Sequence, residues 1–262
     1  MNKLHRLFNF AFFLAFCALI TVAFIQNCYA SDSHSTAASS AENCFNSAKT
    51  QLELDQCAGI DLGNSKASFD ALYNKLLSIY ANNTSFTKKL KISQSAWVEF
   101  TQMQLLMKYP HSGEQNYYGS VYPMCGAEYL SSLYSQRVQS LSPIAMQLQY
   151  AIYGSLAKQA SATLKDMYRI IISKYSDDKL FISAFQAANT AWLDYQKAQL
   201  TAMFPQSSTK LFDGTSMNAN DYLGALEMQR ITELRDWTSG IEEGDVCSGS
   251  VKTPEELSLG SQ

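Results

Sequence analysis

The sequence predicts an all-α protein made of two tandem small helical bundles, each of three to four helices and stabilised by disulfide bonds. Apolar residues recur at three- and four-residue spacing through most of the chain, as they do along one face of a helix. Many residues recur 95 positions later, and four cysteines, an even number, follow residue 30. No stretch shows the sustained alternation typical of strands.

The N-terminus has the pattern of a signal peptide. Two basic residues precede an apolar run over residues 7–25, and Cys28-Tyr29-Ala30 offers small residues at the −3 and −1 positions of a cleavage site. We therefore expect residues 1–30 to be removed after Ala30 and the mature protein to be periplasmic or secreted, with no attachment to a membrane. The alternative is an uncleaved anchor, because about 18 apolar residues can span a bilayer.

The first predicted copy covers residues 44–141. It follows a Ser/Ala-rich leader, residues 31–43, which we expect to be disordered. Thr50 and Glu53 form a capping box at the start of its first helix. Apolar spacing predicts that this first helix ends near Asn82-Asn83. A second helix is predicted from about Phe86 to Lys108, before Pro110, and a third is predicted to end near Leu141.

The second predicted copy covers residues 142–238, and a flexible tail is expected over residues 239–262. Matches occur at offset 95 up to Pro110 and Pro205, and at offset 93 after the following loop. The one change of offset lies in a loop, where insertions are tolerated. This pattern indicates a degenerate tandem duplication.

The segments ISQSAWVEF and AANTAWLDY place Trp97 and Trp192 at equivalent positions. Each lies on the apolar stripe of its helix, so we expect structural core residues, the alternative being an aromatic ligand cage. Gln104 and Gln199 lie on the same stripes and are expected to hydrogen-bond the loops that follow. Arg137 and Arg230 are predicted to clamp each copy by pairing with its own carboxylates, those of Glu99 and Asp194.

The mature chain contains Cys44, Cys57, Cys125 and Cys247, for which three disulfide connectivities are possible. Cys44 and Cys57 are close in sequence and flank the start of the first helix, so we pair them, which leaves Cys125 for Cys247. The spacings do not suit a metal site. With two histidines left after cleavage, and no recognisable nucleophile or phosphate loop, we expect no cofactor and no enzymatic activity.

Loops 110–124 and 205–220 are the candidate partner-binding surfaces, through Tyr117, Tyr118, Tyr122, Leu211 and Phe212. Aromatic residues beside glycine supply rigid contact area on many binding surfaces. The alternative is that they fold under the loops and complete the core.

Charge narrows the classes of partner. Loss of Lys3 and Arg6 with the signal peptide leaves a formal net charge of −5. No basic stripe suggests a nucleic acid or an anionic membrane as partner.

Several segments resemble a bacterial family named for the N-terminal domain of the lysozyme inhibitor LprI. They are Cys44 and Cys57 around the Thr-x-x-Glu box, FDALYNKLL, KLKISQSAWVEF, the Gly119-Ser120 loop before Cys125, and SQRVQSL. The resemblance covers residues 44–141 and, more weakly, residues 148–236. It implies a small, exported, helical, disulfide-bonded protein that binds a protein partner.

Departures from the family pattern affect that expectation. Thr101 and Gln102 replace an Arg-Asp pair, and Leu105 replaces a cysteine, which leaves Cys125 without its usual partner and strengthens the pairing with Cys247. The resemblance implies a lysozyme inhibitor, and a negatively charged chain suits a cationic lysozyme. The alternative is a cell-envelope scaffold or secreted interaction protein without effect on lysozyme.

Overall fold

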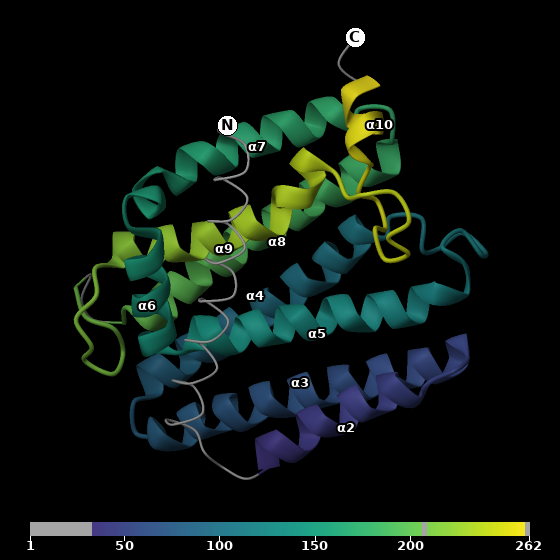
Figure 1. Ribbon diagram of the computed structural model, residues 1–262. Coiled ribbons are helices and arrows are strands. Elements are labelled where there is room, and N and C mark those ends of the chain that lie inside the picture. Colours follow the sequence, from purple (N-terminus) through teal and green to yellow (C-terminus); the bar gives the residue numbers. More distant parts are fainter. Residues whose placement is uncertain (1–32, 206–208, 260–262) are drawn as a thin grey trace, which may run out of the picture.

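The computed structural model describes residues 33–205 and 209–259 (Figure 1). The expected signal peptide lies outside these ranges. Within them the chain is helical and has no strand beyond one isolated bridge between Lys210 and Ser216, which confirms the all-α prediction. None of the helices described is long and apolar enough to cross a membrane.

The helices carry the labels of Figure 1, and their bounds define the terms used below. They are α2 (Ser33–Ser47), α3 (Gln51–Ile79), α4 (Thr84–Lys108), α5 (Tyr122–Leu141), α6 (Pro143–Tyr153), α7 (Ala160–Lys174), α8 (Lys179–Met203), α9 (Ala219–Ser239) and α10 (Pro254–Leu259), with 3-10 turns at Gly119–Val121 and Gly154–Gln159.

Local signals account for the longest helices. The Thr50–Glu53 capping box begins α3. Asn83 and Asp178, which are 95 residues apart, cap α4 and α8 by accepting from the amides of Phe86 and Phe181. Both bounds of α8 lie 95 residues after those of α4.

The leader differs from the prediction. Residues 33–43, expected to be disordered, form the first part of α2. Alanine has high helix propensity, and the Cys44–Cys57 disulfide holds α2 against α3. Ala41 is buried as a result.

The two predicted copies interlock, so neither encloses a core of its own. Helix α4 of the first copy packs along α8 of the second, while α3 packs on α5 and α7 on α9 (Figure 1). The two central helices are antiparallel, because Lys89 near the start of α4 donates to the Pro205 carbonyl beyond the end of α8, at 3.2 Å. Both large apolar clusters contain side chains from both copies.

The C-terminal segment packs against the bundle, where a flexible tail was expected. The Ser250 amide donates to the Lys108 carbonyl (2.8 Å), and the Trp237 indole N–H donates to Ser250 Oγ (3.0 Å). Val251 and Leu257 are buried in the core that α4, α7 and α8 share. We call residues 240–258 the strap.

Candidate functional site

The centre of the molecule is a reciprocal hydrogen-bond network between the copies. Arg137 Nη1 on α5 donates to Gln199 Oε1 on α8 (2.7 Å), and Arg230 Nη1 on α9 donates to Gln104 Oε1 on α4 (2.8 Å). Each glutamine also donates to a tyrosine hydroxyl of its own copy, Tyr129 or Tyr222. Equivalent residues of the two copies therefore make equivalent hydrogen bonds across the interface between the copies.

The tryptophan segments lie beside this network and are buried. Trp97 is 3% exposed and Trp192 is 5% exposed. The rings of Phe100 and Tyr195, equivalent residues, stack at 5.8 Å between the copies. The small cavity beside them, about 20 Å³, has room for about one water molecule and no larger ligand.

Arg137 does not pair with a carboxylate of its own copy, contrary to the sequence prediction. Among the described residues its guanidinium meets neutral acceptors, including Gln94 Oε1 at 3.1 Å and Tyr195 OH at 3.1 Å. Glu99 cannot reach it because Glu99 lies on the exposed side of α4. Arg230 forms an ion pair with Glu233 of its own copy (2.9 Å), and burial raises the pKa of Glu233.

The two candidate loops lie at opposite ends of the antiparallel α4–α8 pair and do not form one surface (Figure 1). In the second loop, Leu211 is buried and Phe212 stacks on Phe86 at 4.5 Å between ring centroids. These two side chains complete the core, as the alternative interpretation proposed.

In the first loop, one of the three candidate tyrosines is exposed. Tyr118 and Tyr122 pack edge-on against the buried Tyr109, at 5.1 and 5.2 Å between ring centroids. Tyr117 is 56% exposed, and its ring stacks on His111 at 4.2 Å. Of the three candidate tyrosines, Tyr117 is therefore the one most available to a partner.

His111 fixes this loop to the start of α8. Its Nδ1 lies 2.5 Å from Glu114 Oε1, and its Nε2 lies 3.2 Å from Asp178 Oδ2. The hydrogen bond to Glu114 is the largest cause of a raised His111 pKa, and the hydrogen bond to Asp178 raises it further. No local sequence pattern predicts this arrangement, because Asp178 lies 67 residues away from His111.

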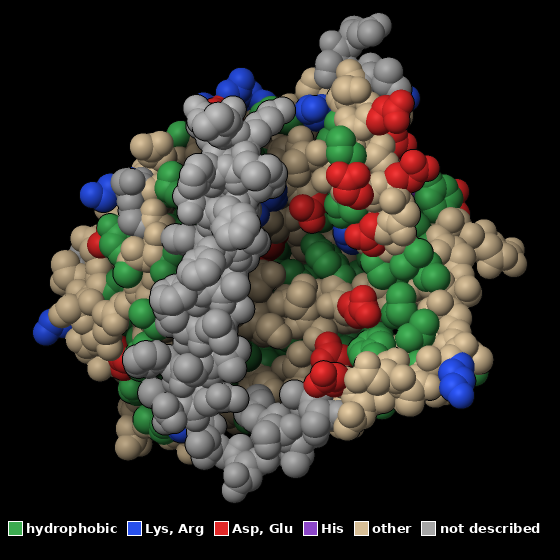
Figure 2. Space-filling model, viewed as in Figure 1, with side chains coloured by type: hydrophobic (Ala, Val, Ile, Leu, Met, Phe, Trp, Pro, Cys, Tyr) green, Lys and Arg blue, Asp and Glu red, His purple; other side chains and the backbone are tan. Residues whose placement is uncertain are grey.

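Carboxylates gather next to this loop, around the Cys125–Cys247 disulfide. Burial raises the pKa of Glu128, and the charges of Asp61 and Asp245 raise it further. Tyr109 joins the loop to this region by donating its hydroxyl to the Cys247 carbonyl at 3.4 Å. Asp236 and Asp245 lie near Lys108, and the exposed Glu242 and Glu243 come just before Asp245 in the strap. We call this surface the acidic end, and we assign to it Asp61, Glu128, Asp236, Glu242, Glu243 and Asp245. Figure 2 shows acidic side chains gathered on the side of the molecule that carries α10 and the strap.

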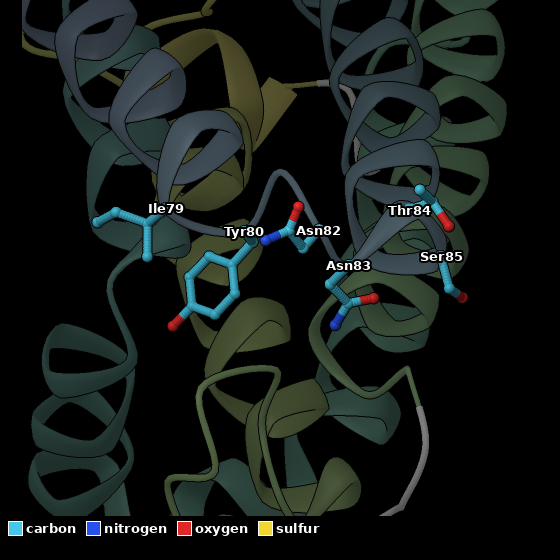
Figure 3. A pocket seen from close by; sticks show the side chains of 6 residues that line it. All are labelled: Ile79, Tyr80, Asn82, Asn83, Thr84 and Ser85. Carbon is cyan, nitrogen blue, oxygen red and sulfur yellow. The ribbon is translucent and has the colours of Figure 1, made fainter.

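A shallow hollow of about 480 Å³ lies at the turn between α3 and α4, far from the acidic end along α4 (Figure 3). Ile79, Tyr80, Asn82, Asn83, Thr84 and Ser85 line it. All six lie between the end of α3 and the first residues of α4, and Asn83 Oδ1 is already engaged as the α4 cap. The hollow offers no acid–base pair or nucleophile beside a base. Throughout the described ranges, no group of side chains suits a metal ion.

Both predicted disulfides, Cys44–Cys57 and Cys125–Cys247, are confirmed. The second one fixes the strap to α5.

Residues 42–141 match the family model described as lysozyme inhibitor LprI. No curated protein and no solved structure matches the chain. The matched range contains α3, α4, α5 and the loop that carries Tyr117.

Proposed function

Because residues 42–141 match the family model described as lysozyme inhibitor LprI, we propose that this chain is an exported, non-enzymatic protein that binds and inhibits a lysozyme-type muramidase. The family match carries the proposal. The signal-peptide pattern supports export to the periplasm or beyond the cell, where a muramidase acts on the wall.

The acidic end is the surface we assign to the muramidase. A cationic lysozyme is attracted to a cluster of carboxylates, and complementary charge mainly speeds association. Glu128, Glu242 and Glu243 are exposed there. Tyr117, on the adjoining loop, adds an exposed aromatic side chain of the type enriched at interfaces.

The matched range and the strap both contribute to this surface. Asp61 and Glu128 lie within residues 42–141, whereas Asp245 comes from the strap. The Cys125–Cys247 disulfide joins these parts. The strap, which follows the second predicted copy, thus supplies part of the proposed binding surface.

Residual lysozyme activity against a cell-wall suspension tests the proposal. The protein, purified after export, is added in increasing molar ratio to a cationic lysozyme, with heat-denatured protein as the control. We expect activity to fall in a saturable way. Full activity at a large molar excess would reject inhibition, and binding without inhibition would favour the scaffold alternative.

A further inference from the structure

The helix that joins the two predicted copies, α6, turns its aliphatic residues outward. Ile144, Leu148 and Ile152 are 59%, 47% and 55% exposed, and Leu156 in the following 3-10 turn is 57% exposed. Residues four apart lie on one face of a helix. Ile144, Leu148 and Ile152 therefore lie on one exposed face of α6, and Leu156 exposes a further aliphatic side chain in the turn that follows. We call these four residues the α6 stripe.

The inward side of α6 buries Met146 and packs Tyr150 and Tyr153 against the core, and it also makes polar contacts. Gln149 Nε2 donates to the Ala225 carbonyl of α9 (3.3 Å), and Gln149 Oε1 accepts from Gln229 (2.7 Å). Gln147 Nε2 donates to the Ser216 carbonyl at 2.9 Å. A surface helix normally buries its apolar face and exposes its polar one. Helix α6 departs from this pattern because apolar residues lie on both of its sides, and its exposed aliphatic residues mark a contact surface.

The absence of charged residues from the sequence around the α6 stripe indicates which kind of partner binds it. Residues 138–157 contain no charged side chain, the longest such stretch after the N-terminal apolar run. In a twofold dimer each patch faces the same patch of the other copy, so a charged patch would repel itself. For a chain of net negative charge, an uncharged apolar face is the surface through which copies can meet without repulsion. A membrane-surface helix would carry Lys or Arg on its polar face, and α6 has none.

We propose that two copies of this chain associate through the α6 stripe, antiparallel, with Leu148 and Ile152 closest to the twofold axis. The stripe is about 18 Å long, since a helix rises about 1.5 Å per residue. Standard interfaces bury about 800 Å² per partner, and so narrow a surface forms a reversible dimer. The proposal is independent of lysozyme binding. The stripe lies near the second loop, so the acidic ends of both copies remain accessible (Figure 1).

Analytical ultracentrifugation of the exported protein tests the proposal over concentrations from about 1 μM to about 1 mM, the range of a reversible complex. We expect the mean mass to rise from one chain towards two. The variant Leu148→Lys/Ile152→Lys should weaken association at least about tenfold while the helical circular dichroism is kept. The control Ile172→Lys/Leu193→Lys adds the same charge at residues of similar exposure, 42% and 48%, and should associate like the wild type.

Three results would overturn the proposal. One is a monomer at every concentration, and another is equal association of the stripe variant and the wild type. The third is a monomer that binds vesicles of neutral lipid through the stripe, which would make the partner a lipid surface. If the lysine variant unfolds, Leu148→Gln/Ile152→Gln provides the same comparison with less perturbation.

Discussion

The hydrogen bonds of the two buried arginines differ at equivalent atoms. Arg137 Nε donates to Gln94 Oε1 at 3.1 Å. The residue equivalent to Gln94 in the second copy is Asn189, which is shorter by one methylene. Among the described side chains, Arg230 Nε and Asn189 Oδ1 are buried and have no hydrogen-bond partner. A buried unsatisfied polar group costs about 1–3 kcal/mol.

Restoring the missing methylene should stabilise the protein. We expect Asn189→Gln to raise the free energy of unfolding by about 1 kcal/mol, because it lets Arg230 reproduce the bond that Arg137 makes. The reverse change, Gln94→Asn, should lower it by a similar amount. Denaturant unfolding measures the free energy of unfolding of both variants, compared at an unchanged dependence of that free energy on denaturant concentration. Equal midpoints for the wild type and both variants would contradict the equivalence of the two sites.

The two carboxylates around His111 predict a pH dependence. The folded pKa of His111 is raised above its ordinary value of about 6.5, so its stabilising contribution is complete below that pH. It is lost as pH rises through the higher folded pKa. The thermal midpoint of the wild type should therefore fall as pH rises from the ordinary to the folded pKa of His111. We expect the thermal midpoint of the His111→Gln variant to fall less over the same pH range. An NMR titration with a His111 pKa at or below about 6.5 would contradict the assignment.

At the scale of elements, the helix bounds of the matched range follow from local signals. The sequence predicted a helix from Phe86 to Lys108, and α4 is Thr84–Lys108. Pro110 and the Asn83 cap are local features that a sequence shows directly. The position of the strap could not be predicted from local sequence features. It depends on contacts across more than a hundred residues, such as Ser250 with Lys108 and Met107.

The disulfide that holds the strap should matter more than the one that holds α2. Cys125 and Cys247 are 122 residues apart, whereas Cys44 and Cys57 are 13 apart. On the chain-entropy model, the long loop is worth about 4–5 kcal/mol and the short one about 3 kcal/mol. We expect Cys125→Ala/Cys247→Ala to lower the denaturant midpoint more than Cys44→Ala/Cys57→Ala. An equal or reversed order would contradict this role of the strap.

At the scale of the whole molecule, sequence periodicity could not distinguish two separate bundles from two interlocked copies. Both arrangements bury the same apolar stripes, so α4 shows the same pattern whether it packs on α3 or on α8. The interlocked arrangement is evident at Arg137, whose hydrogen-bond partners include side chains of both copies. Equivalent contacts by Arg230 and Gln104 support the proposed duplication.

The shared core predicts that one copy is not self-sufficient. Residues 42–141 alone would expose the face of α4 that packs on α8, including Phe100 and Gln104. We expect this fragment to be unfolded or to dimerise through α4. Circular dichroism and light scattering distinguish these outcomes from a folded monomer. A helical monomer with cooperative unfolding would contradict the shared core.

The measurement that tests the central claim most directly is a binding titration of the exported protein with a cationic lysozyme, using two charge-matched variants. Glu128→Gln/Glu242→Gln/Glu243→Gln removes three exposed carboxylates from the acidic end, and Glu99→Gln/Asp166→Asn/Asp194→Asn removes three from other surfaces. We predict at least about tenfold weaker binding for the first variant, about 1.4 kcal/mol, and wild-type affinity for the second. Equal weakening by both variants, or none by the first, would contradict the assignment of lysozyme to the acidic end.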